Sequence, residues 1–497
     1  MTDYLLHPEL VLDLCLAASS PETHELIGLA ESRRDGLWIY LGHLPLLSQI
    51  LATDLGRDTA NARLKNLVEA VNGVSVQKQD VDLLLADSPN DGLGGLLGRL
   101  GDNANVLRKT SGEDGEITLA DYFESELPVG VPFVDLAYQQ RQIRARVESG
   151  LLGVLRHGRY IGGPEITELE QQLAAYVGVK HAFAVSNGTD ALLIAMLAAG
   201  VKPGDEVITS PFTFAATGEM IHLLGARPVY VDIDPVTYNL DANHLGAAAT
   251  EKTRAIIPVS IFGQCADMDA INQFGSTQGI CVIEDAAQSF GATYKGRRSC
   301  AVSDIACTSF FPSKPLGGYG DSGAVFTDND ELATILSQVR DHGQSGRYRH
   351  ARIGINGRMS SFQASVLLAK LELFKDEVRL RAEVGARYTE MLDQSGIDGE
   401  SLVCPGIAEH NTSVYAQYSI LVHSREAFQK RMQALGVPTA VHYPVPLNRQ
   451  PAMQDADCKV AIAENVSGRV VSVPMHPYMS RDEQQKVVDA VVRSIQD

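Results

Sequence analysis

The sequence lacks an excess of basic residues and a long apolar run. It has 497 residues, with 42 Lys and Arg against 61 Asp and Glu, and a formal net charge of -19 at pH 7. Nucleic acids and anionic membrane surfaces are bound through clustered Lys and Arg, so neither is expected as the main partner. No apolar run approaches the roughly 20 residues that span a bilayer. The N-terminus also lacks the basic start and small-residue cleavage site of a signal peptide.

Cysteine is scarce and scattered. The seven cysteines stand singly at positions 15, 265, 281, 300, 307, 404 and 458. They form no C-x-x-C pair and no Cys/His cluster with zinc spacing, so we expect no metal site. A protein of this kind is expected in the reducing cytoplasm.

The length predicts more than one domain, because single domains usually run to roughly 100–200 residues. We expect an N-terminal α/β unit over 1–128, a large domain over 129–372 and a small α/β domain over 373–497. From Phe133 onward, short β-branched runs alternate with helical patterns, which is typical of a mostly parallel sheet covered by helices.

The expected elements of the large domain follow from these patterns. Strands are expected at 181–186, 205–211, 227–234, 254–263, 279–287 and 304–311, and helices at 189–200, 214–225 and 267–279. A long helix over 359–392 leads into the small domain. There we expect a strand at 415–422, a helix at 425–436, a strand at 437–445 and a final helix at 481–495.

The stretch SFFPSKPLGGYGDSG, residues 309–323, contains a G-x-G-x-x-G spacing and a lysine. A dinucleotide fingerprint should follow a strand and open a helix, but here a strand, AVFT, comes next. We expect the glycines to let the chain turn tightly after the lysine. Lys314 stands between two prolines at a strand end, where burial would favour the neutral amine that attacks carbonyl groups.

Asp285 lies at the end of an expected parallel strand, in EDAAQSFG. Open α/β sheets bind ligands at this edge, and a carboxylate there could keep a pyridine nitrogen protonated. The alternative for Asp285 is a helix N-cap. The turn with Gly188 and Thr189 opens a helix whose N–H groups suit a phosphate, and Ser309 could add a hydroxyl. Plain capping of that helix is the alternative.

Phe212 follows a proline at a strand end and could stack on a flat ring, with a place in the core as the alternative. Phosphate turn, aromatic side chain, acid and lysine occur in the order that pyridoxal phosphate requires. These segments resemble the sugar aminotransferases of the DegT/DnrJ/EryC1/StrS family, through RYIGGPEITELE, SNGTDAL, SPFTFAAT, VIEDAAQSFGATYKGR and VHYPVPLNRQP. The resemblance covers about residues 131–495.

The resemblance implies a fold-type-I pyridoxal phosphate transferase. It implies that Lys314 forms the Schiff base with the cofactor and then moves a proton between the substrate Cα and the cofactor. Asp285 would pair with the pyridinium nitrogen, and Gln288 would hydrogen-bond the phenolic oxygen. Phosphate would be held by Gly188, Thr189 and Ser309, while Phe212 would cover the ring.

A homodimer with shared active sites is also implied, because Asn356 in GINGR is similar to the residue that reaches a phosphate in the neighbouring subunit. We expect Arg358 to hold a carboxylate of L-glutamate or of a uronic acid; a surface ion pair is the alternative. His442 and Tyr443 are further candidates for the substrate, or a buried structural pair. Tyr160 in GRYIGGP is expected near the sugar.

The motifs ACTSFFPSKPLG and GINGRMSSFQA are most similar to the branch that aminates a UDP-linked 3-oxo glucuronic acid for surface polysaccharides such as O-antigen. A 4-keto sugar is an alternative substrate. A second alternative is a sugar dehydratase, since the family includes such enzymes. They have histidine at the position of Lys314. A regulatory scaffold is a third, against which the intact Lys314 and Asp285 argue.

Residues 1–128 faintly resemble a PIN-type nuclease domain, with Asp13 and Asp91 at fitting positions. Such a site needs several carboxylates that converge on divalent metal, and the others are missing. We therefore expect a degenerate, non-catalytic unit that docks a partner, such as a pathway enzyme, rather than a nuclease.

Overall fold

The computed structural model describes residues 4–6, 37–39 and 131–496. The chain divides into two compact units, Met1–Leu127 and Pro128–Asp497. In the first unit, strands β1 (Tyr4–Leu6) and β2 (Leu37–Ile39) pair in parallel. Asp13 and Asp91 lie outside the described residues, so the PIN-like unit stays a prediction.

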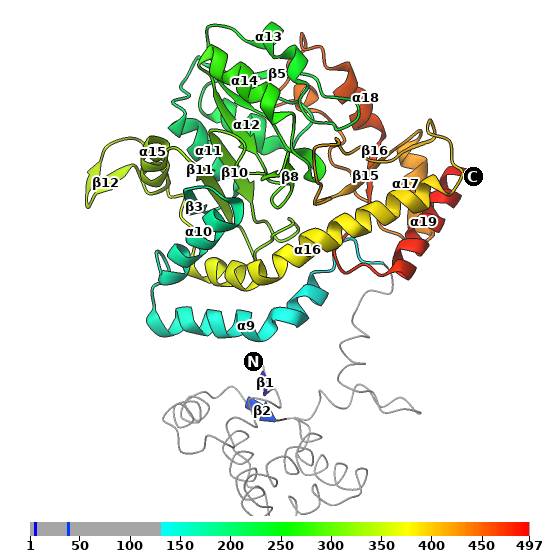
Figure 1. Ribbon diagram of the computed structural model, residues 1–497, viewed down its shortest axis with the longest axis horizontal. Helices are drawn as coiled ribbons and strands as arrows, with labels where there is room; N and C mark the ends of the chain where they lie inside the picture. The colour runs from blue at the N-terminus through cyan, green and yellow to red at the C-terminus, as the bar shows by residue number, and fades with distance from the viewer. Residues whose placement is uncertain (1–3, 7–36, 40–130, 497) are drawn as a thin grey trace, which may run out of the picture. The chain divides into compact units, whose positions relative to one another are not determined.

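A seven-stranded sheet forms the centre of the second unit (Figure 1). Its order is β3-β11-β10-β7-β6-β4-β5, and only β11 runs antiparallel to its neighbours. Its strands are β3 (His181–Val185), β4 (Glu206–Thr209), β5 (Arg227–Tyr230), β6 (Thr253–Ile257), β7 (Cys281–Asp285), β10 (Ile305–Ser309) and β11 (Gly323–Thr327). The six strands expected from the sequence are confirmed, as is the strand after GYGDSG.

Helices cover both faces of this sheet, because alternate residues of each strand point to opposite faces. Val325 packs with one group of helices, whereas Ala324 and Phe326 pack with the other. The first group is α11 (Gly188–Ala198), α12 (Ala215–Leu223) and α15 (Asp330–Arg340). Across the sheet lie α10 (Pro164–Val177), α14 (Met268–Gln278) and the long α16 (Ser361–Asp393). The short α13 (Leu245–Ala248) precedes β6.

A second, antiparallel sheet supports the C-terminal part. It contains β14 (Leu402–Val403), β15 (Tyr418–Val422) and β16 (Val470–Val473), with α17 (Arg425–Ala434), α18 (Ala461–Arg469) and α19 (Arg481–Gln496). The strand expected at 437–445 is wrong: only Ala440 bridges to Ser472 there. Pro438 and Pro444 have no N–H for a ladder, and β16 takes the place of that strand.

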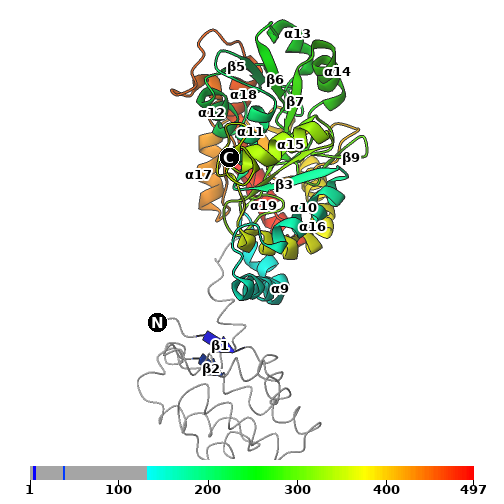
Figure 2. The same cartoon turned by 90° about the vertical axis from the view of Figure 1, so that its left-hand side faces the viewer.

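The expected boundary at 372/373 falls inside α16, whose 33 residues run unbroken. Leu367 of this helix joins the core under the large sheet, and Tyr388 joins the core of the second sheet. Helix α9 (Leu136–His157) runs beside α16 in Figures 1 and 2. Just before α9, Val131 packs in the core of the second sheet rather than in that of the large domain.

Two hairpins complete the second unit. Strands β8 (Thr293–Tyr294) and β9 (Arg297–Arg298) form a short one after β7. Strands β12 (Gln344–Gly346) and β13 (Arg349–His350) form another, which projects beyond α15 (Figure 1). No helix among the described residues is long and apolar enough to cross a membrane.

His476 is expected to make the stability of this fold depend on pH. Its side chain is buried, and neither ring nitrogen has a hydrogen-bond partner in the described part of the chain. Burial lowers the pKa of the imidazole, Asp135 and Glu483 oppose that shift, and Arg381 adds to it. The unfolded chain therefore takes up this proton more readily than the folded one.

We expect the stability contributed by a neutral His476 to be present above the unfolded pKa of about 6.5 and to be lost as pH falls below it. Thermal unfolding of wild type and His476→Leu should be compared at pH 7.5 and about pH 5.5. The variant should lose fewer degrees between the two pH values. His423→Leu, at an exposed position, should follow the wild type, and an equal pH slope for all three proteins would disprove the assignment.

Candidate active site

The candidate residues gather at the carboxyl edge of the large sheet. Asp285 is the last residue of β7, Ser309 is the last of β10, and the two strands are hydrogen-bonded neighbours. Gly188 opens α11 after β3. Because parallel strands end at one edge, residues separated by about 120 positions meet there. The structure thus brings Asp285, Ser309 and Gly188 to one edge of the sheet.

Asp285 is a buried carboxylate whose two oxygens both accept hydrogen bonds. Oδ2 accepts from the Thr217 hydroxyl at 2.9 Å, and Oδ1 accepts from the Ala287 N–H at 3.2 Å. Burial raises its pKa, while the two hydrogen bonds and the nearby Lys314 act to lower it. Lys314 is half-buried, and burial lowers the pKa of its ammonium, which Asp285 opposes. The pair can therefore supply an uncharged amine beside a carboxylate.

The loop that carries Lys314 folds back on itself as expected. The Lys314 N–H donates to the Phe311 carbonyl at 2.8 Å, and the Gly318 N–H donates to the Phe310 carbonyl at 2.7 Å. A Cβ on Gly317 would come within 2.2 Å of the Pro312 carbonyl oxygen. The glycines of this stretch therefore serve a tight turn, and the sequence GYGDSG leads into β11 rather than into a helix.

The turn at Gly188 forms a cradle between β3 and β10. A Cβ on Gly188 would lie 2.7 Å from the Ser309 Cβ, so the two residues are in close contact. Asn187 caps α11, but its side chain takes only the Asp190 N–H, at 2.7 Å. The first turn of a helix leaves further N–H groups free, and Gly188 and Thr189 offer theirs at this point.

Gln288 has a fixed orientation. Its Oε1 accepts from the Phe262 N–H at 2.8 Å, which leaves Nε2 as the donor, and Nε2 lies 3.0 Å from the Tyr443 hydroxyl. Burial raises the pKa of Tyr443, with a further rise from Asp285. Burial also lowers the pKa of His442 to about 4, and Lys314 adds to this shift. Tyr443 and His442 therefore lie in the same region as Asp285 and Lys314, and Tyr443 joins its hydrogen-bond network.

Phe212 is not available to cover a ring. It is fully buried, with Phe262 and Tyr238 edge-on to it at centroid distances of 5.8 and 6.3 Å. The core alternative holds for this residue. Phe214, two residues later, is 56% exposed and lies 6.0 Å from the Tyr443 ring. Phe214 is thus the aromatic side chain that faces the site.

Arg358 and Asn356 lie beside the phosphate turn. The Ser186 N–H donates to the Gly357 carbonyl at 3.0 Å, and Val185 bridges to Arg358. The Arg358 guanidinium donates to Asp341 at 2.8 Å and to the Asn356 side chain at 3.2 Å, and it remains partly exposed. Asn356 is exposed.

Tyr160 lies between α9 and α10, and its carbonyl accepts from the Ser361 N–H at the start of α16 at 2.8 Å. Its ring stacks on Phe362 at 5.6 Å and is 47% exposed. The structure reports no contact between this ring and the Asp285, Gln288 and Tyr443 network within residues 131–496.

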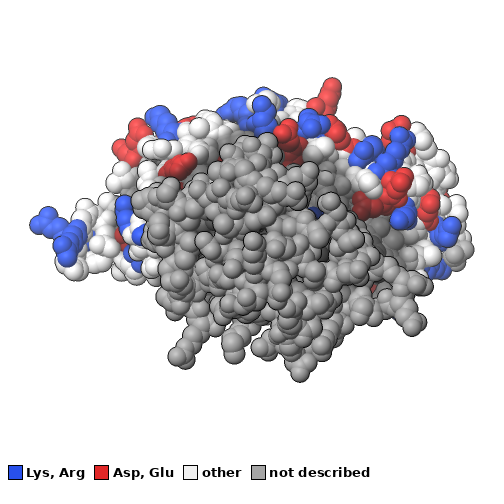
Figure 3. All heavy atoms as spheres, turned by 90° about the horizontal axis from the view of Figure 1, so that it is seen from below, with Lys and Arg blue, Asp and Glu red and all other residues white. Residues whose placement is uncertain are grey.

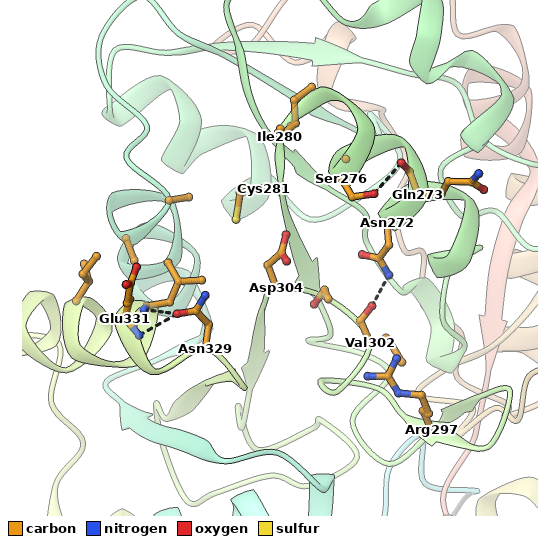
Figure 4. A pocket seen from close by; sticks show the side chains of 17 residues that line it. Asn272, Gln273, Ser276, Ile280, Cys281, Arg297, Val302, Asp304, Asn329 and Glu331 are labelled. Carbon is orange, nitrogen blue, oxygen red and sulfur yellow. Dashed lines mark hydrogen bonds between the residues drawn. The ribbon is translucent and has the colours of Figure 1, made fainter.

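A hollow at the opposite, amino edge of the sheet has a different character (Figure 4). Its polar groups bond to the protein itself: Asp304 accepts from the Val282 N–H at 2.9 Å, and Asn272 donates to the Val302 carbonyl at 2.6 Å. Burial raises the pKa of the Cys281 thiol there to about 12. None of the candidate residues lines this hollow.

The residues at the carboxyl edge fit pyridoxal phosphate. Asp285 is a buried carboxylate to which no described residue donates a charged hydrogen bond, and a protonated ring nitrogen would supply one. The bare Cα of Gly188 and the first turn of α11 offer a place for a phosphate. Within residues 131–496 and the two short N-terminal strands, no group of three or more His, Cys, Asp or Glu could hold a metal ion.

A mostly parallel sheet with a lysine loop after one strand and a buried aspartate at the end of its neighbour defines a fold-type-I pyridoxal phosphate transferase. Residues 141–492 match the DegT/DnrJ/EryC1/StrS aminotransferase family. The chain belongs to this family, whose members depend on pyridoxal phosphate.

Individual relatives agree with this assignment. The chain is 56% identical over 349 residues to the UDP-2-acetamido-2-deoxy-3-oxo-D-glucuronate aminotransferase of Pseudomonas aeruginosa, a match that covers 70% of this chain and 96% of the relative. The structure of a DegT DnrJ EryC1 StrS aminotransferase from Brucella abortus matches with a TM-score of 0.70 and 38% identity, over 74% of this chain and 100% of that one. The NtdA structure from Bacillus subtilis, with bound cofactor PMP, matches with a TM-score of 0.68 and 29% identity, over 73% of this chain and 83% of that one.

The two phenylalanines of SPFTF give a matched test. Phe212→Leu removes packing inside a closed core. It should lower the free energy of unfolding by about 1–2 kcal/mol, and the unfolding temperature with it. Phe214→Leu should leave that temperature nearly unchanged but weaken pyridoxal phosphate binding several-fold, because a ring stack is worth about 1 kcal/mol. Differential scanning calorimetry and a cofactor titration measure the two effects. If Phe212→Leu alone weakened cofactor binding, the assignment of Phe214 would be wrong.

Proposed function

We propose that this chain transfers the amino group of L-glutamate to UDP-2-acetamido-2-deoxy-3-oxo-D-glucuronate, in the assembly of a surface polysaccharide. The observation that carries the proposal is the 56% identity to the Pseudomonas enzyme of that name. It is supported by an intact lysine and aspartate at the carboxyl edge of the sheet. We also propose a place in the reducing cytoplasm, which the six free cysteines of the described residues support.

The residues around Asp285 have separate tasks in this proposal. When bound, pyridoxal phosphate supplies an electron sink for the carbanion that forms at the substrate carbon. Asp285 keeps the ring nitrogen protonated, and Gln288 donates to the phenolic oxygen through Nε2. Phosphate is held by Gly188, Thr189 and Ser309. Phe214 takes the place next to the ring that the sequence had suggested for Phe212.

Lys314 moves the proton. Its amine must be uncharged to accept a proton from the substrate carbon, and the lowered pKa of its buried side chain favours that form. The same amine would then give this proton to the cofactor carbon. A family dehydratase would have histidine here, so Lys314 favours transamination over dehydration. Amination of a 4-keto sugar remains the alternative substrate class.

We further propose a homodimer in which each active site is completed by the other subunit. Support comes from the β12–β13 hairpin and the strand of chain after it, which project from the body (Figure 1). Tyr348 is 81% exposed and Ile353 is 84% exposed, the two highest values among the large apolar side chains of the described residues. The projecting segment also carries three basic residues, Arg347, Arg349 and Arg352. Basic side chains gather at the left of Figure 3, on the side to which this segment projects.

In this dimer, the exposed Asn356 reaches the phosphate of the neighbouring site. Arg358 holds a carboxylate of L-glutamate or of the uronic acid, while His442, Tyr443 and Tyr160 contact the sugar. The N-terminal unit is proposed to dock another enzyme of the pathway.

Lys314→Ala should fold and bind pyridoxal phosphate through Asp285 and the phosphate turn, but lose turnover by several orders of magnitude, since Lys314 is the one described lysine that acts on Asp285. An absorption spectrum of wild type with pyridoxal phosphate should change to that of the amino form when L-glutamate is added. The Lys314→Ala spectrum should not change on the same timescale. Lys295→Ala, which removes an exposed lysine paired with Asp269, is the control. Near-normal conversion by Lys314→Ala would refute the assignment.

Arg358→Ala should raise the KM for L-glutamate or for the uronate sugar about tenfold or more, because a carboxylate held by a guanidinium gains about 1.5–3 kcal/mol. Its affinity for pyridoxal phosphate should change little. Arg227→Ala removes an exposed arginine that donates to Glu206 at the amino end of β4 and β5 and serves as the matched control. An unchanged ratio of substrate to cofactor affinity in Arg358→Ala would remove this residue from the site.

A further inference from the structure

Thr217 belongs to none of the roles assigned above, yet it touches the central carboxylate. It lies in the first turn of α12, is 1% exposed, and its hydroxyl is 2.9 Å from Asp285 Oδ2. Its main-chain N–H bonds separately, to the Phe214 carbonyl at 3.3 Å. The side chain is thus not required for capping, and its hydroxyl is directed at Asp285.

The hydrogen bonds have a defined direction. The Ala287 N–H can only donate, so Asp285 Oδ1 must accept. The Thr217 hydroxyl has one proton, and at 3.2 Å the Thr213 hydroxyl can donate to its oxygen. A chain from Thr213 through Thr217 to Asp285 then satisfies all three groups with Asp285 as an acceptor at both oxygens. A proton on either oxygen would weaken the bond that this oxygen accepts, because an uncharged carboxyl group is a poorer acceptor than a carboxylate.

Helix α12 therefore presents two groups to the site within one turn. Phe214, at its start, is exposed toward Tyr443, while Thr217 points inward to Asp285. A hydroxyl at this place fixes which way the carboxylate plane faces, since the Ala287 N–H is the one other donor to the Asp285 side chain among residues 131–496. Hydrogen bonds to the charged form of a carboxylate favour that form.

We propose that Thr217 is a positioning residue that holds Asp285 as an oriented carboxylate. The proton between Asp285 and the cofactor would then stay on the ring nitrogen. This inference rests on the proposed function only in placing the cofactor ring against Asp285. Thr217 does not touch the substrate and acts through Asp285.

The test compares full-length variants with and without the hydroxyl. Thr217→Val removes the hydroxyl but keeps the shape of the side chain. Thr217→Ala removes the hydroxyl without a risk of overpacking, and Thr217→Ser keeps it. Thr209→Val is the matched control, because this buried threonine donates to the Ile257 carbonyl at 2.8 Å rather than to Asp285. Pyridoxal phosphate affinity, the absorption spectrum of the bound cofactor and the rate of its conversion by L-glutamate are measured, with unfolding temperature as a check of folding.

Thr217→Val and Thr217→Ala should bind pyridoxal phosphate about tenfold more weakly, since a hydrogen bond to a charged group is worth about 1.5–3 kcal/mol. They should also shift its spectrum and slow conversion by a similar factor or more. Thr217→Ser should recover most of each loss, and Thr209→Val should match wild type in all three. A Ser variant that behaves like Ala, or a Val and Ala pair that match wild type, would overturn the inference while leaving the proposed function intact. A wild-type protein that binds no pyridoxal phosphate would instead overturn the proposed function, and this inference with it.

Discussion

The active-site edge depends on one buried carboxylate. Placing the charge of Asp285 inside the protein costs several kcal/mol unless donors and a cation offset it. Two donors come from the chain itself, Thr217 and the Ala287 N–H. The remaining compensation must come from a positive group at the free side of the carboxylate. The site is therefore built to be completed by a cationic ring, and a lysine close by competes for the same charge until the ring is bound.

The sheet order explains how this carboxylate meets its partners. β7 lies between β10 and β6, so the loops after β7 and β10 leave the sheet side by side. The Ser260 N–H, after β6, donates to the Asp285 carbonyl at 3.0 Å. Gln288 then follows in the turn beyond Asp285 and bonds to Phe262 on one side and Tyr443 on the other. Segments from both sheets are thus fixed around one strand end, which leaves little freedom for the groups that face the cofactor.

Much of this could be read from the sequence, since it is encoded locally. Short β-branched runs marked the strands, and Lys314, Asp285 and Gly188 each stood at a strand or helix end. Phe212 and Phe214 stand two positions apart, and only the distant Phe262 and Tyr238, which pack against Phe212, determine that Phe212 is buried while Phe214 is exposed. The strand at 437–445 failed because β16, about 30 residues later, pairs with β15 instead. Partner choice between distant segments, like the Thr217 to Asp285 bond, has no local signature.

The contacts to Asp285 do not set the substrate selectivity. Everything that contacts Asp285 concerns a ring common to the whole family, so it cannot distinguish one keto sugar from another. A UDP-linked uronate carries negative charge on its phosphates and its carboxylate, and this chain has a formal net charge of -19. Attraction of such a substrate therefore needs local cations. Arg358 lies beside the phosphate turn, where it bridges to Val185, and Arg347 and Arg349 lie in the β12–β13 hairpin. Arg358 is ion-paired with Asp341 in the structure. In the proposed role, this bond would set the position of the guanidinium before a carboxylate arrives and so reduce the entropy lost on binding.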